Sequence, residues 1–196
     1  MNKNITTTNE HETILPIHYL VSYKDKNIKE IIADYKFENG RYNKLLLDIL
    51  IDICIYSILH NPNTDILFTS PPSTMYHKKE KNVDSMNNLL KLASIYINDY
   101  FNIKSHNGCI YFRDLFTIDI NYLKNNGARH IKNNRKSRLS NSDRYCIKNR
   151  FKKYLYNAKI VIIDDISTTG GTLSSCQKSL KNFSSDLDIE LFSIAH

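Results

Sequence analysis

The sequence has no CxxC pair among its four cysteines, which are Cys54, Cys109, Cys146 and Cys176. Their wide separation excludes the usual spacing of a zinc ribbon or a redox motif, and we expect them to pack as reduced side chains. No stretch reaches the roughly 18 uncharged apolar residues of a membrane span, and the first residues lack the apolar segment of a signal peptide. We therefore expect a cytoplasmic protein that has no disulfides and no membrane partner.

The sequence also has no internal repeats, and its composition is not that of a disordered chain. Hydrophobic residues make up 41% of the 196 residues and charged residues 24%, which is ordinary globular usage. The length fits one domain with its own core. Residues 1–13 are polar and without periodicity. We expect residues 1–20 to form a loose N-terminal arm and residues 21–196 to form a single domain.

The net charge is positive, +7 at pH 7. Such a charge permits attraction to nucleic acid or to a phosphorylated small molecule. The sequence is also rich in Lys, Asn, Ile and Tyr, which AT-rich codons encode, so a biased genome explains the same charge. Composition alone leaves both origins open.

Apolar residues at helical spacing predict helices over residues 23–37, 42–59, 84–101 and 172–183. Short apolar runs predict strands that begin at Asp65, over 158–163 and over 189–195. Segment 109–122 fits a strand, a helix or one of each. Strands that alternate with helices indicate an α/β fold, with a mostly parallel sheet flanked by helices and a small N-terminal helical elaboration.

The segment from Ile160 to Thr172 joins a buried strand to a helix through hydroxyl and glycine residues. Ligands of open parallel sheets collect beyond the carboxyl ends of the strands, where a helix N-terminus offers backbone N–H groups to an anion. The predicted phosphate ligands are Ser167, Thr168, Thr169, Gly170, Gly171 and Thr172. An ordinary strand-to-helix turn, in which Asp and Thr cap the helix, is the alternative.

Two adjacent carboxylates, Asp164 and Asp165, precede this loop. They would repel a phosphate but accept hydrogen bonds from a vicinal diol, which ribose hydroxyls supply. The spacing therefore describes one sugar phosphate, with its 2- and 3-hydroxyls at the aspartates and its 5-phosphate in the loop. A P-loop would need a lysine where this chain has Thr172, so nucleotide triphosphate hydrolysis is disfavoured.

The run Ile160-Val-Ile-Ile-Asp-Asp-Ile-Ser-Thr-Thr-Gly-Gly-Thr resembles the phosphoribosyl-pyrophosphate motif of type I phosphoribosyltransferases. Further segments resemble the ComF group of that superfamily, known for a part in DNA uptake during natural competence. They are the Tyr23 helix with its Lys-Phe end, the strand and proline loop from Asp65, Lys81-Asn-Val-Asp, Arg144, Phe151, and the strand ending Phe192-Ser-Ile-Ala-His. The family's frequent N-terminal cysteine zinc module is absent, and Asn82 and Val83 replace its usual Gly and Phe.

The resemblance implies displacement of pyrophosphate at the anomeric carbon of ribose, a phosphoribosyl transfer in which Mg²⁺ bridges pyrophosphate and sugar oxygens. Mg²⁺ uses few protein ligands, so no protein metal cluster is expected. The loop Ser70, Pro71, Pro72 and Ser73 would face the pyrophosphate, or it serves only to end the strand. A basic lid, or a merely solvated basic surface, is formed by Arg129, Lys132, Arg135, Lys136 and Arg138.

Three functions follow. The first is a ComF-like enzyme or binding protein for phosphoribosyl pyrophosphate. The second is a purine or pyrimidine salvage phosphoribosyltransferase, for which no base-selecting hood is identified. The third is a basic DNA-processing accessory protein, whose partners would be single-stranded DNA or a competence helicase. A dimer fits all three, and no catalytic base is assigned.

Overall fold

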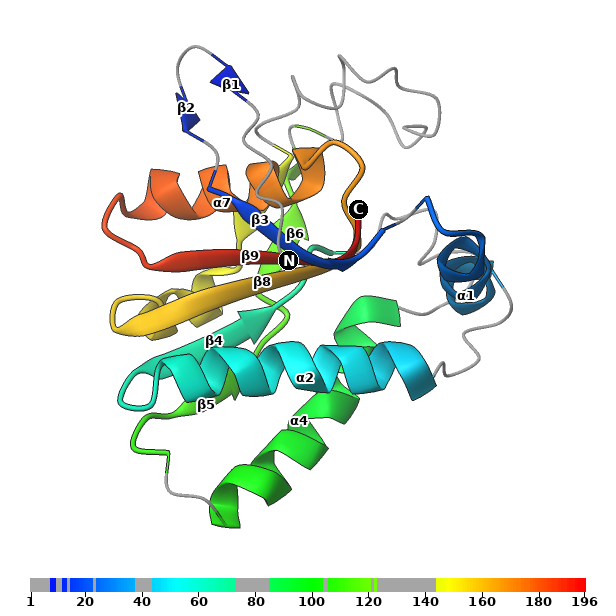
Figure 1. The fold of residues 1–196 in the computed structure, drawn as a ribbon. Coiled ribbons are helices and arrows are strands. Elements are labelled where there is room, and N and C mark those ends of the chain that lie inside the picture. Colours follow the sequence, from blue (N-terminus) through cyan, green and yellow to red (C-terminus); the bar gives the residue numbers. More distant parts are fainter. Residues whose placement is uncertain are drawn as a thin grey trace.

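The computed structural model describes residues 8–9, 12–13, 15–22, 24–37, 44–72, 85–103, 106–120, 122 and 144–196. At its centre lies a five-stranded sheet in which all neighbouring strands are parallel, in the order β3-β9-β8-β4-β5 (Figure 1). These strands are β3 (Ile17–Val21), β4 (Asp65–Thr69), β5 (Ile110–Phe112), β8 (Ala158–Ile166) and β9 (Ile189–Ala195). The predicted α/β class and parallel sheet are confirmed.

Two short antiparallel pairs accompany the sheet. They are β1 (Thr8–Asn9) with β2 (Glu12–Thr13), and β6 (Phe116–Ile118) with β7 (Tyr145–Ile147). Segment 109–122, which the sequence left open, thus contains the two short strands β5 and β6. Strand β7 comes from a later part of the chain, where no strand was predicted.

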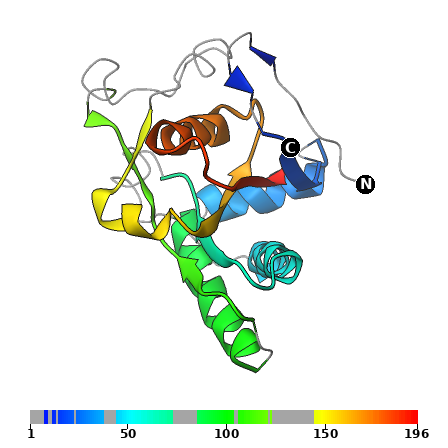
Figure 2. The same ribbon diagram turned by 90° about the vertical axis from the view of Figure 1, so that its left-hand side faces the viewer.

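Helices cover both faces of the sheet. Helices α2 and α4 lie on one side and α7 lies on the other (Figures 1 and 2). The helices are α1 (Lys26–Phe37), α2 (Lys44–His60), α4 (Ser85–Ile103), the 3-10 helix η1 (Asn149–Tyr154) and α7 (Gly171–Phe183). Within the described ranges, none of these helices combines the length and the apolar character that crossing a membrane requires.

The alternation of side chains along β8 builds two cores. Ile160 and Ile162 pack into the cluster beneath α7, whereas Val161 and Ile163 pack into the cluster beneath α2 and α4. When both faces of a strand are buried, its sequence is a continuous apolar run, because successive side chains point to opposite faces and all of them must be apolar. This is why the sequence predicted β8 so clearly.

The expected loose arm over residues 1–20 is wrong for its last residues. Ile17–Val21 forms β3, whose Ile17 and His18 lie opposite Leu191 and Phe192 of β9. Strand β3 is an edge strand, with Leu20 exposed and only Ile17 buried. Such a half-exposed strand lacks the long apolar run of a central strand, and its partner lies at the far end of the sequence.

Two leucines, one buried and one exposed, allow the packing of the core to be tested. Leu67 on β4 is fully buried, whereas Leu59 on α2 is 61% exposed. We expect Leu67→Ala to lower the free energy of unfolding by about 2–5 kcal/mol, because it leaves a cavity. Leu59→Ala should change it by less than about 0.5 kcal/mol. Urea unfolding followed by circular dichroism measures both, and equal losses would contradict the described packing.

Candidate functional site

Two of the predicted segments meet at one edge of the sheet. Strands β4 and β8 are parallel neighbours, so their carboxyl ends lie at the same edge. Ser70, Pro71 and Pro72 follow β4, and the loop from Ser167 to Gly170 follows β8. The structure therefore brings the proline loop and the hydroxyl-glycine loop to adjacent strands, which sequence separation alone did not require.

The loop after β8 turns sharply into α7. The Ser167 N–H donates to the Ala195 carbonyl of β9 at 2.9 Å, which ties the loop's start to the sheet. Gly170 then adopts φ +71°, in the left-handed region that favours glycine. The space there is narrow as well, since a Cβ on Gly170 would lie 3.0 Å from Ile17 Cδ1.

Helix α7 begins without a side-chain cap on its N-cap residue, Gly170. The N-cap is thus a glycine and not the Asp or Thr of the alternative raised by the sequence. The Gly171 N–H reaches Thr169 Oγ1 at 3.4 Å, a long hydrogen bond. The first N–H groups of a helix have no partner inside it and lie at the positive end of its dipole. The helix end retains the character of an anion site.

Ser167 is a second notable residue of the loop, because its buried hydroxyl has no hydrogen-bond partner among the described residues. Its side chain is 3% exposed. Buried hydroxyls are normally paired with protein or ordered water. An anion or a water molecule held by the loop would satisfy it. Of the other predicted ligands, Thr168 is exposed, and Thr169 and Thr172 are half-buried.

The sequence predicted that the two aspartates follow the strand, but the structure places both of them within it. Strand β8 continues through both of them to Ile166, three residues past the predicted end. Asp164 lies close enough to Cys176 and Tyr145 to act on them: burial raises the pKa of both groups, and the Asp164 charge raises each pKa further. The regular alternation of β8 does not continue past Asp164, because Ile166 packs against the cluster beneath α2 and α4, as Ile163 does.

The expectation that both carboxylates hold the ribose hydroxyls stays a prediction. Asp164 belongs with the residues beneath α7, where the Arg144 charge lowers the pKa of Tyr145 and of Cys176. Asp165 is half-buried, and its Oδ1 accepts the Ile166 N–H at 2.7 Å.

Ser70 has a different role from the one expected. Its side chain is fully buried, and its hydroxyl donates to Asn87 Oδ1 of α4 at 2.9 Å. Asn87 Nδ2 in turn donates to Asp114 Oδ1 at 3.4 Å, and Lys148 Nζ contacts Asp114 Oδ2. With its proton already used, Ser70 is an anchor for the proline loop and not a donor to pyrophosphate.

The sequence did not identify this polar chain. Its members come from the ends of β4 and β7, from α4, and from the segment after β5, so no local spacing relates them. Other predicted residues lie outside the described ranges, and these are Tyr23, Ser73, Lys81, Asn82, Val83, Asp84, Arg129, Lys132, Arg135, Lys136 and Arg138.

Comparison with known proteins adds no relative to this geometry: no family model matches the sequence, and no curated protein matches it.

The glycine pair allows the loop geometry to be tested. Gly170→Ala should lower the free energy of unfolding by about 1–2 kcal/mol, because alanine disfavours the left-handed conformation. Gly171→Ala should be neutral or raise it by up to about 1 kcal/mol, since Gly171 opens α7 and alanine favours helix. Thermal unfolding of the two variants measures the contrast. A Gly170→Ala protein as stable as the parent would contradict the positive φ.

Proposed function

We propose that this chain is a ComF-like protein of the type I phosphoribosyltransferase fold, which binds phosphoribosyl pyrophosphate at the carboxyl edge of its sheet. The supporting fold is a parallel α/β sheet with the loop from Ser167 to Gly170 between a central strand and a helix N-terminus. The single observation that carries the proposal is the buried Ser167 hydroxyl, without a partner in the described chain, beside that helix end.

The hydrogen-bond donors of the loop and the carboxylates at this edge bind different parts of the ligand. The 5-phosphate takes the loop, where backbone N–H groups and the Thr169 and Thr172 hydroxyls are the donors. The ribose hydroxyls donate to Asp164 and Asp165. Asp164 also holds its surroundings beneath α7, so we assign it a mixed role of support and binding.

The reaction would break the bond between the anomeric carbon and the pyrophosphate oxygen, with the acceptor's lone pair forming the new bond and pyrophosphate leaving with the electrons. Mg²⁺, when bound, neutralises charge on the leaving pyrophosphate. The described residues contain no group of three or more His, Cys, Asp or Glu side chains suited to a metal ion. Mg²⁺ held mainly by substrate oxygens and water would need no such group.

Titration with phosphoribosyl pyrophosphate and Mg²⁺ by calorimetry tests the proposal. We expect saturable binding, weakened about 10- to 100-fold in Asp165→Asn because a charge-assisted hydrogen bond is lost. Asp188→Asn is the matched control, since Asp188 is exposed and precedes β9 at the opposite end of the sheet. Asp164→Asn should lower both stability and affinity. No saturable binding, or affinity unchanged in the Asp164→Asn, Asp165→Asn double variant, would overturn the sugar-phosphate site.

A second candidate function, binding of single-stranded DNA, has its own observation. Cations and aromatic rings alternate around η1: the Arg113 guanidinium lies 5.7 and 5.5 Å from the Tyr111 and Tyr154 rings, and Lys153 Nζ lies 5.0 Å from the Tyr154 ring. Arg150 lies 4.6 Å from the Phe151 ring. Residues 144–163 include no Asp or Glu. Stacking rings among cations suit a flexible strand of bases and phosphates.

Fluorescence anisotropy with a labelled oligothymidine tests this function. Replacing Arg113, Arg150 and Lys153 together by Gln should weaken binding and reduce the slope of log K against log salt by about 2, or about 0.7 for each phosphate that the protein no longer neutralises. The control triple variant changes the exposed lysines Lys26, Lys44 and Lys91 in the same way. Equal losses of affinity in both triple variants would mean that charge alone attracts the DNA.

A further inference from the structure

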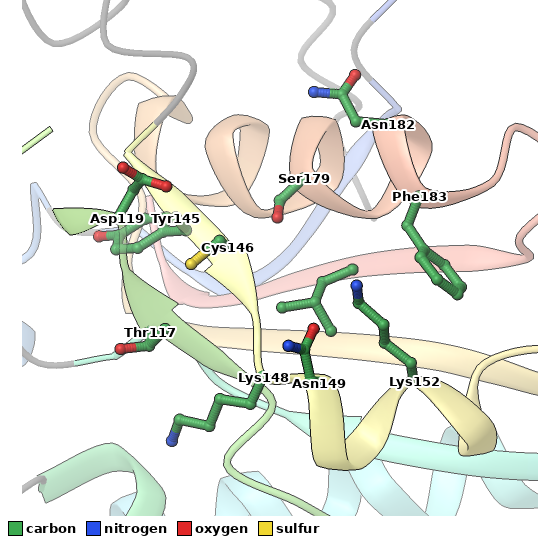
Figure 3. Close-up of a pocket in the computed structure, with 11 residues that line it drawn as sticks. Thr117, Asp119, Tyr145, Cys146, Lys148, Asn149, Lys152, Ser179, Asn182 and Phe183 are labelled. Carbon is green, nitrogen blue, oxygen red and sulfur yellow. The ribbon is translucent and has the colours of Figure 1, made fainter. Parts of the chain in front are cut away.

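A separate pocket lies between β7, η1 and the last turn of α7, and we name it the β7–α7 pocket (Figure 3). Its volume is about 760 Å³, within the roughly 300–1,000 Å³ of small-molecule sites. Its walls include Asp119, Cys146, Ile147, Lys152, Ser179 and Phe183. None of these residues was predicted as a ligand-binding residue.

This pocket is distinct from the loop at the carboxyl edge. The loop leads into Gly171 at the start of α7, whereas Ser179 and Phe183 belong to the second half of that helix. Ser179 lies eight positions after Gly171 in the helix, which is about 12 Å along the axis. A ligand here would not compete directly with one held by Ser167 and its neighbours.

Lys152 is the lining residue whose charge bears most on the choice of ligand. Its side chain is half-buried, and its Nζ lies 5.4 Å from the centre of the Phe183 ring. Within the described part of the chain no carboxylate forms an ion pair with it, whereas Lys148 is paired with Asp114 and Lys159 with Glu190. Partly burying an ammonium without a counter-charge is unfavourable, and an anion in the pocket would relieve the cost.

The charges of the pocket are separated. In Figure 3 the Lys152 ammonium rises from η1 towards α7 beside Asn149, and the Ser179 hydroxyl points down from α7 towards the pocket. Asp119 lies at the opposite side, next to Tyr145. Hydrogen-bond donors therefore gather at the η1 end, and the carboxylate at the β6 end repels a second anion. A ligand with one charged end would be held in one orientation.

Part of the remaining wall is apolar, beside the polar side chains of Thr117 and Asn182. Ile147 and Phe183 line the pocket, and the Phe183 ring packs at 5.5 Å from the ring of the exposed Tyr156. Aromatic and aliphatic surface of this kind favours a ring-sized apolar body. From these contacts we propose that the β7–α7 pocket binds a small organic anion, a ring-sized apolar body that carries one phosphate or carboxylate group, with the anionic group at Lys152.

Cys146 gives a direct readout of occupancy. It lines the pocket and is half-buried, Cys54 and Cys176 are fully buried, and Cys109 is exposed. In a Cys109→Ser background a thiol reagent should therefore modify Cys146 first. Burial and the Asp119 charge raise the pKa of the Cys146 thiol, whereas Lys152 lowers it, so the reaction is followed at a fixed alkaline pH.

The probes separate the anion from the apolar body. Phenyl phosphate and benzoate carry both, inorganic phosphate carries only the anion, and benzyl alcohol carries only the ring. We expect phenyl phosphate, benzoate or both to slow modification of Cys146 saturably, at concentrations at least about tenfold lower than the other two probes need. The more effective of the two aromatic anions identifies the preferred charged group.

Variants of neighbouring lysines complete the test. Lys152→Gln should raise the half-protecting concentration at least about tenfold, and Lys152→Arg should restore it, because the cation is kept. Lys153→Gln, the matched control on an exposed side chain, should leave it unchanged. Half-protecting concentrations are compared, not rates, since Lys152 also acts on the thiol.

Three results would overturn the proposal: no saturable protection by either aromatic anion up to about 10 mM, the weak end of specific binding; equal protection by benzyl alcohol; or the same half-protecting concentration in Lys152→Gln. If Lys152→Gln does not fold, Ser179→Val replaces it and should weaken protection by the aromatic anions. Asp165→Asn should not affect protection, so failure of the sugar-phosphate proposal leaves this one standing.

Discussion

The position of β8 in the middle of the sheet determines most of what this structure can do. The strand is hydrogen-bonded to β9 on one side and to β4 on the other, and its side chains feed two cores in alternation. Because all these strands are parallel, their carboxyl ends open at one edge. The polar residues that end β8 are therefore presented together with the loop after β4, while the apolar residues before them hold the layers together.

Helix α7 contributes to two different sites. Its first turn faces the loop that we propose to hold a phosphate, and its last residues form a wall of the β7–α7 pocket. Between these ends, Leu173, Cys176 and Leu180 are buried against the sheet. The packed face of α7 thus fixes the positions of both ends of the helix. Asp164 acts electrostatically on both Cys176 of α7 and Tyr145 of β7.

The sequence predicted those elements whose signal is local. Strands β4 and β8 contain continuous apolar runs, β9 is mostly apolar apart from Glu190 and Ser193, and the helices have apolar residues at regular spacing. The sequence pattern therefore predicts both kinds of element. The sequence pattern does not indicate β3, which is only partly buried, and it ends β8 three residues too early because Asp164 and Asp165 interrupt the apolar run. The hydrogen bonds of Ser70 with Asn87 and of Asn87 with Asp114, and the position of Lys152 beneath Phe183, depend on segments far apart in the chain, which no spacing encodes.

The pairing of β3 with β9 also bears on how the molecule is made. Ile17 lies opposite Leu191, and the His196 N–H donates to the Val21 carbonyl at 3.1 Å. Since a ribosome delivers the chain from its N-terminus, β3 leaves the exit tunnel long before the strand that pairs with it has been translated. During that interval the backbone edge of β3, with Leu20 beside it, lacks its partner strand, so this side of the sheet can form only once β9 has been translated.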